Sequence, residues 1–220
     1  LCISQDVNDL MASIYQAEIS PHTMPVHLGH LNYQPSKLEE AVDKWHHDTI
    51  PLDYVMMVSD PATLSGGGFE YFVGTKMEAE ELSKQGKTPP RDRVKAPKFP
   101  GPGYAVALHG NMVVHRGAPL TKPGERITMV NAYVSMDCLV DDQSRSRDLI
   151  GIDDPAALYA EWAKHASWRT QNRLQQIIDS MAFDQEPDQV LDQLEFAAND
   201  LLKTINDMKA GPREAQHYEQ

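Results

Sequence analysis

The stretch WHHDTIPLDYVMMV, residues 45–58, joins a His-His-Asp cluster to a short apolar run that follows Pro51. The run at 52–58 has the length of a strand and the composition of a buried one. From residue 45 to about residue 139 more short apolar or alternating runs follow, separated by Gly, Pro and Asn. Such punctuation is typical of a chain that folds back on itself as short strands. We therefore predict a region of β structure here.

Four further runs in this region read as strands: GFEYFVG at 68–74, GYAVAL at 103–108, NMVVH at 111–115 and RITMVNAYV at 126–134. Several short strands at such spacing favour a sandwich, a barrel or a jelly roll. We expect a mainly β core of this kind, with α-helices flanking it.

The segments before this region are predicted to be mixed. Residues 5–18 place apolar side chains at helical spacing, and residues 25–33 read as a strand. Residues 36–45 favour a short helix or turn, with Ser36 as N-cap and Glu39 completing a capping box.

Residues 75–103 interrupt the β pattern with a highly charged and then Pro-rich sequence. We expect a short helix followed by an extended excursion over the surface. Long ordered loops in compact domains are often lids over a site. A solvated insertion without such a role is an equal alternative.

Two amphipathic helices are predicted after residue 150, at 154–181 and at 188–211. Their apolar stripes comprise Leu158, Trp162, Leu174, Ile177, Ile178 and Met181 in the first helix, and Val190, Leu191, Leu194, Ala198, Leu201, Leu202, Ile205 and Met208 in the second. We therefore divide the chain into a β domain at 1–150 and a helical extension at 151–220. The extension is expected to pack on the core or to form a homodimer contact.

The bulk composition excludes several classes of function. The chain has 220 residues and a formal net charge of −12, which argues against a nucleic-acid partner because phosphate binding relies on clustered Lys and Arg. No apolar run approaches the roughly 20 residues of a membrane span, so no membrane role is expected. Two cysteines are too few for a disulfide framework and fit a reducing, cytoplasmic compartment.

The His-His-Asp cluster is a candidate metal site. If residues 45–49 form a strand or strand end, His46 and Asp48 point to the same face and His47 points to the other. A strand would then deliver one imidazole and one carboxylate to a common point. The best third ligand is His115, which ends the apolar run at 111–115 just before Gly-Ala-Pro. Two histidines and one carboxylate form a facial triad for iron, with open positions for other ligands.

A candidate anion-binding pair, an arginine and a threonine, follows His115 in the sequence, and the arginine lies eleven residues after this histidine. Arg126 starts the run at 126–134, and Thr128 shares its face. A hairpin is expected to bring this strand back beside the one that carries His115. Together they offer a guanidinium fork and a hydroxyl to a carboxylate.

Five motifs, taken in order, resemble the double-stranded β-helix core of the Fe(II)/2-oxoglutarate-dependent dioxygenases. They are WHHDT, GGGFEYF, GYAVAL, NMVVHRGAP and GERITMVNAYV, and the resemblance covers about residues 25–137. The resemblance implies His46, Asp48 and His115 as iron ligands. It implies Arg126, helped by Thr128, as the anchor for the distal carboxylate of 2-oxoglutarate, with Tyr33 at a position that often serves this cosubstrate. The cofactors implied are Fe(II), 2-oxoglutarate and O2.

The implied activity is oxidation, by default hydroxylation, of a small molecule such as an amino acid or natural-product intermediate. Related halogenases lack the carboxylate that Asp48 provides, so halogenation is not expected. Desaturation or ring closure at the same iron centre, a cupin-like metal enzyme without 2-oxoglutarate, and a non-catalytic binding module remain alternatives. Candidate substrate-pocket residues are His30, Trp45, Phe69 and Tyr71, and core packing is an alternative for each.

Overall fold

The computed structural model describes residues 1–34, 38, 40–138, 140, 142, 144 and 146–219. Its helices are α1 (Gln5–Tyr15), α2 (Lys76–Lys84), α3 (Pro155–Ser180) and α4 (Pro187–Ala210), with short 3-10 turns at Pro25–His27, Pro61–Thr63 and Arg91–Arg93. Its strands are β1 (Ile19–Pro21), β2 (His30–Tyr33), β3 (Asp43–His46), β4 (Leu52–Met57), β5 (Phe69–Phe72), β6 (Val94–Lys95), β7 (Ala105–Leu108), β8 (His115–Gly117) and β9 (Ile127–Ser135).

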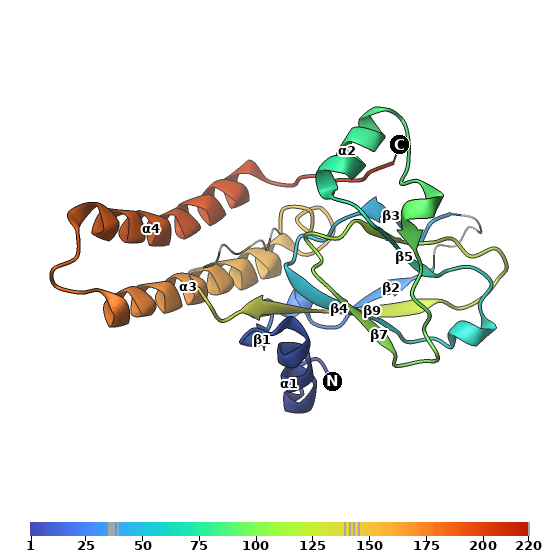
Figure 1. Ribbon diagram of the computed structural model, residues 1–220, viewed down its shortest axis with the longest axis horizontal. Coiled ribbons are helices and arrows are strands. Elements are labelled where there is room, and N and C mark those ends of the chain that lie inside the picture. The colour runs from blue at the N-terminus through green and yellow to red at the C-terminus, as the bar shows by residue number, and fades with distance from the viewer. Residues whose placement is uncertain are drawn as a thin grey trace.

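The strands form two antiparallel sheets, which are not closed into a single barrel (Figure 1). The first has the order β1-β9-β4-β7, with β2 also pairing with β9, and the second has the order β3-β8-β5-β6. The long strand β9 has β4 on one side and β1 and β2 on the other. Both edges of β9 are therefore occupied, and β8 does not pair with it. The prediction of a hairpin between the His115 and Arg126 segments is wrong.

Strand β4 is apolar except for Asp53, because both of its faces are covered. On one face Leu52 and Tyr54 pack with Met11 of α1 and Tyr133 of β9. On the other face Val55 packs with side chains of the second sheet. The two sheets thus stack face to face, and the predicted mainly β core with flanking helices is confirmed.

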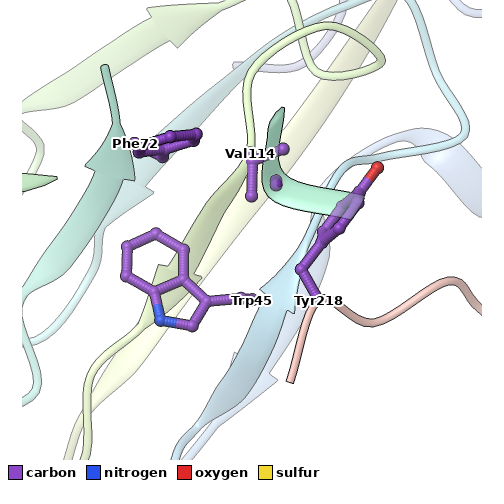
Figure 2. Packing of buried hydrophobic residues seen from close by; sticks show 5 residues of the cluster. Trp45, Phe72, Val114 and Tyr218 are labelled. Atoms are coloured by element: carbon purple, nitrogen blue, oxygen red, sulfur yellow. The ribbon is translucent and has the colours of Figure 1, made fainter. Parts of the chain in front are cut away.

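A separate cluster lies on the outer face of the second sheet. Trp45 of β3 packs with Phe72, Val114 and Tyr218, and Figure 2 shows these side chains converging. Tyr218 belongs to the segment after α4, and its backbone N–H donates to the Trp45 carbonyl at 2.7 Å. The end of the chain is therefore anchored against the strand that carries His46.

Two predicted strands are shorter in the structure. The run at 111–115 is not extended: the N–H groups of Met112 and Val113 both donate to the His109 carbonyl, and β8 begins at His115. A turn is needed here because the chain crosses from β7 in one sheet to β8 in the other. Likewise β3 ends at His46, because the N–H of Asp48 donates to the Gly110 carbonyl instead of to a ladder partner.

The predictions before β3 need similar corrections. The segment 25–33 starts as a 3-10 turn, because Pro25 has no N–H to donate to a ladder, and only its second half forms β2. Within 36–45 the end is strand β3 and not helix. The predicted capping box of Ser36 and Glu39 lies outside the described residues.

The C-terminal helices form a hairpin that projects from the sheets (Figure 1). Asp154 caps α3 by accepting from the N–H of Ala156, and Gly211 follows α4 with φ 74°, as the sequence predicted for the two ends. Leu158 and Trp162 of α3 pack with Met24 at the start of the chain. No helix in the described part of the chain is both long and apolar enough to cross a bilayer.

Candidate metal centre

Strand pairing within the second sheet brings the two predicted histidine ligands together. His46 and His115 are register partners in β3 and β8, so their side chains share a face. Asp48 lies two residues beyond the end of β3 and reaches the same point because its N–H is held by Gly110. A Cβ at Gly110 would lie 2.8 Å from Asp48 Oδ2, so only glycine allows this approach.

The ligand atoms of the three side chains converge. The distance from His46 Nε2 to Asp48 Oδ1 is 3.3 Å, and that from His115 Nε2 to Asp48 Oδ2 is 3.5 Å. One ligand atom from each side chain lies within 4.8 Å of the others. These spacings suit a single ion held between the three groups.

Both imidazole rings are oriented by the backbone. His46 Nδ1 lies 2.6 Å from the Lys44 carbonyl, and His115 Nδ1 lies 2.9 Å from the Val113 carbonyl. A carbonyl only accepts, so Nδ1 carries the proton and donates in each ring. Nε2 of each ring then faces Asp48, which is the orientation that metal-binding histidines use, and a metal ion would displace any proton on these nitrogens.

The three groups also perturb one another's ionisation. Burial lowers the pKa of His46, but the hydrogen bond to Asp48 and the charge of Asp43 outweigh it and raise the pKa to about 9. Burial raises the pKa of Asp48, yet the neighbouring His115 and His46 hold it well below its usual range. For His115 burial dominates and lowers the pKa. The carboxylate is therefore ionised and ready to bind a cation.

A second buried carboxyl group lies behind the trio and was not predicted from the sequence. Asp53 of β4 is fully buried, and burial, followed by the charge of Asp48, raises its pKa well above the usual value. A neutral Asp53 can donate a hydrogen bond to Asp48, which two ionised carboxylates could not share. The only signal in the sequence is an acid inside the apolar run at 52–58.

Arg126 enters the same pocket from the facing sheet. It lies just before β9, is 2% exposed, and donates from Nε to the Gly67 carbonyl at 2.5 Å and from Nη1 to Thr128 Oγ1 at 3.4 Å. Burial lowers its pKa to about 10, so it is protonated at neutral pH. No carboxylate of the described residues forms an ion pair with it.

This lack of a counter-ion distinguishes Arg126 from the other buried arginines. Arg173 has Asp200 at 2.7 Å, and Arg169 has Asp142 at 3.9 Å. A buried guanidinium without an ion-pair partner is costly, and the charge of Asp43 in the same pocket offsets this cost only from beyond ion-pair distance. Arg126 is therefore a candidate anion-binding group.

The glycine triplet before β5 makes room for this arginine. Gly67 has φ 70°, and a Cβ there would lie 3.0 Å from Arg126 Cδ and 2.7 Å from Leu120 Cδ2. The triplet is thus a loop that leads into β5 beside the pocket.

The pocket that contains these groups encloses a volume of about 50 Å³, and both sheets line it. Phe69 forms one wall and stacks on the His115 ring, with centroids 5.2 Å apart. Tyr71 is the register partner of His115, shares its face and packs in the cluster that includes Phe69. These two candidate pocket residues therefore lie on the side of the candidate ligands.

Other candidate residues lie elsewhere. Tyr33 is 61% exposed and pairs with Ile127, whereas its neighbour Asn32 pairs with Thr128 and lines the pocket. Because side chains alternate along a strand, Tyr33 points away from the pocket that Asn32 faces. His30 shares the face of Asn32 but is exposed and is not among the lining residues.

Trp45 and His47 lie on the side opposite the ligands. Trp45 is buried in the outer cluster, because it alternates with His46 along β3, and so does not line the pocket. His47 Nδ1 lies 2.8 Å from the hydroxyl of Tyr218. The separation of His47 from His46 and Asp48 is therefore as predicted, although the strand itself ends earlier than expected.

A scan against models of known protein families finds no match to this chain, and a search of curated proteins finds no similar sequence. What the trio can do therefore follows from its own chemistry. Two imidazole nitrogens and one carboxylate could hold a divalent first-row metal ion, which would displace the proton from His46 Nε2.

Proposed function

We propose that the protein is a non-haem Fe(II)/2-oxoglutarate-dependent oxygenase that hydroxylates a small organic substrate. The observation that carries the proposal is that one pocket holds both the trio His46, Asp48 and His115 and the guanidinium of Arg126, which has no ion pair with a carboxylate of the described residues. A metal site alone would fit many functions. A buried cation opposite it adds a specific requirement for an anionic ligand.

Iron is the metal that this donor set favours when positions must stay open. Two imidazoles and one carboxylate occupy one side of an ion and leave the remaining positions for other ligands. Iron at such a centre supplies oxidation of a C–H bond by O2, with 2-oxoglutarate converted to succinate and carbon dioxide. The oxygen atoms of O2 then end in the product hydroxyl and in succinate, so that the reaction balances.

The residues of the chain would bind and orient the cosubstrate. Arg126 has guanidinium N–H groups to donate to the distal carboxylate, and Thr128 adds a hydroxyl on the same face. The Gly67 carbonyl fixes the arginine from behind, so its fork is already oriented before a ligand arrives. Phe69 covers His115 and reduces access of water to that side of the centre.

The fold that fits this function is a double-stranded β-helix, or jelly roll. Two stacked antiparallel sheets, with the trio at the ends of β3 and β8 and the arginine at the start of β9, support that assignment. Within the segment 75–103, Ala79 of α2 packs in the outer cluster with Trp45, so α2 lies on the side of the second sheet opposite the pocket.

An anaerobic titration tests the proposal. Addition of Fe(II) and then 2-oxoglutarate should produce the metal-to-ligand charge-transfer absorption of a chelated keto acid. Iron binding without this band would favour a cupin-like enzyme that does not use 2-oxoglutarate. If neither ligand binds, the oxygenase assignment is wrong.

A pair of arginine variants makes the test specific. Arg126→Met should bind Fe(II) but require far more 2-oxoglutarate to develop the band. Arg93→Met is the matched control, because this arginine is exposed and paired with Glu78 at 3.2 Å, away from the pocket. Equal behaviour of the two variants would remove Arg126 from the proposed site.

A further inference from the structure

Helix α4 leaves its apolar side exposed to solvent. Five large aliphatic side chains along it are between 38% and 57% exposed: Leu191, Leu194, Leu201, Leu202 and Ile205. A monomeric protein rarely exposes a continuous apolar stripe of this kind. The stripe therefore requires an explanation.

The contact with α3 does not use this stripe. The side chains of α4 that are buried or half-buried are mostly small or polar: Val190, Gln193, Ala197, Asp200, Thr204, Asp207 and Met208. Asp200 pairs with Arg173 of α3 at 2.7 Å, and the Met208 carbonyl accepts from the Tyr159 hydroxyl. The helix thus turns its more polar side to its own chain and its apolar side outward.

The spacing of the stripe is that of a helix–helix seam. Leu191, Leu194, Ala198, Leu201 and Ile205 alternate at steps of three and four residues. This alternation lines one face of a helix and lets it pack along another helix.

The stripe is also self-complementary when reversed. Leu191 and Ile205 lie seven residues on either side of Ala198, and Leu194 and Leu202 lie four residues on either side. In an antiparallel pair related by a two-fold axis, Leu191 would meet Ile205 of the partner subunit. Leu194 would meet Leu202 of the partner subunit, and the small side chain of Ala198 would let the two helices approach at the axis.

The charges at the two ends of α4 also favour antiparallel packing of the two helices. Asp188 lies in the first turn and Lys209 in the last, and no ion pair within the described residues uses either. An antiparallel arrangement brings each Asp188 toward Lys209 of the partner subunit. A parallel arrangement would bring like charges together.

We propose that the protein forms a two-fold homodimer in which the exposed apolar stripes of two α4 helices pack antiparallel about Ala198. The proposal concerns a surface remote from the metal centre and does not depend on the oxygenase assignment. A two-fold contact uses each residue twice, so single substitutions have doubled effects.

The oligomeric state of the whole chain tests this proposal. Sedimentation or light scattering should give twice the chain mass of 24.6 kDa for the wild type. Leu194→Glu should raise the dissociation constant about 100-fold or more, because a buried leucine is lost and a charge introduced on both helices. Asn199→Glu adds the same charge at an exposed position outside the stripe and should leave the dimer unchanged.

A charge exchange tests the direction of packing. Asp188→Lys alone should weaken the dimer, and the double variant Asp188→Lys with Lys209→Asp should restore it. A wild-type monomer, or a dimer that Leu194→Glu leaves intact, would overturn the interface. A double variant as weak as the single one would overturn the antiparallel arrangement, and circular dichroism of each variant verifies that α4 still folds.

Discussion

Two clusters of histidines in this molecule differ in where their ring nitrogens point. In the first, Nε2 of His46 and of His115 both face Asp48. In the second, His22 stacks on His165 with centroids 4.6 Å apart, and His27 packs edge-on against His22 at 4.5 Å.

The nitrogens of the second cluster are mostly engaged by the protein. His22 Nε2 lies 2.9 Å from Ser144 Oγ, and His165 Nδ1 lies 2.6 Å from Thr23 Oγ1 while its Nε2 contacts Asp142 at 2.5 Å. Within the described residues only the first cluster presents three ligand atoms close enough for one metal ion. The comparison shows that the direction of the lone pairs, more than the number of histidines, makes a metal site.

The largest expected effect separates the two clusters by substitution. His115→Ala should abolish iron-dependent succinate formation while the protein remains folded, because one of three ligands is lost. His165→Ala should instead lower the free energy of unfolding by about 3 kcal/mol, because Asp142 loses a buried partner. Succinate assays with denaturant unfolding of both variants check this. If both variants lost activity to a similar extent and were equally stable, the two clusters would not differ in function.

The second expected effect concerns the anion that Arg126 would bind. Replacing Arg126 by Met should weaken 2-oxoglutarate binding by at least about 100-fold, since two hydrogen bonds to a charged group contribute about 1.5–3 kcal/mol each and about 1.4 kcal/mol corresponds to a factor of ten. Fe(II) binding should persist, because the guanidinium does not contact the trio. Calorimetric titration of the iron-loaded variant measures the change. Unaltered affinity would show that the pocket recognises its ligand by other groups.

The second cluster, of His22, His27 and His165, should make the free energy of unfolding depend on pH. Burial lowers the pKa of His27 from 6.5 to about 4, and burial likewise lowers that of His22. The unfolded chain then binds more protons than the folded one below pH 6.5, so stability is complete above that pH and decreases as pH falls toward 4. His27 alone should account for about 3 kcal/mol of this loss.

The variant His27→Gln isolates this contribution, because it removes the titrating ring. Urea unfolding at pH 7 and at pH 5 should show a shallower pH dependence in the variant than in the wild type. Identical slopes would mean that His27 is not held neutral by the fold.

The smallest expected effect is at the histidine between the two ligands. His47→Ala should leave the affinity for Fe(II) within about 3-fold of the wild type and cost about 1 kcal/mol of stability, from the lost contact with Tyr218. Tyr218→Phe removes the same hydrogen bond and should match it. Loss of iron binding in His47→Ala alone would show that this residue acts on the metal.

Much of the fold could be predicted because its signals are local. The long helices α3 and α4 show apolar spacing with start and stop residues, and β4 is an apolar run interrupted only by Asp53. Alternation correctly separated His47 from His46 and Asp48, even though β3 ends before Asp48. The backbone at Asp48 is held by a hydrogen bond from its N–H to the Gly110 carbonyl, and no local sequence pattern reveals that bond.

What could not be predicted depends on contacts between distant segments. His22 and His165 meet only because α3 packs on the start of the chain, and Asp53 meets Asp48 only because β4 faces the end of β3. Trp45 was wrong as a pocket candidate, and the alternation that separates His47 from His46 also places Trp45 on the face opposite His46. Its burial depends on Tyr218, which returns from the end of the chain.

One measurement tests the central claim most directly: an anaerobic calorimetric titration of Fe(II) into the wild type, His115→Ala and His165→Ala. The account predicts one Fe(II) per chain in the wild type, none in His115→Ala, and one again in His165→Ala. Iron binding that survives His115→Ala, or that is lost with His165→Ala while the protein is folded, would contradict it.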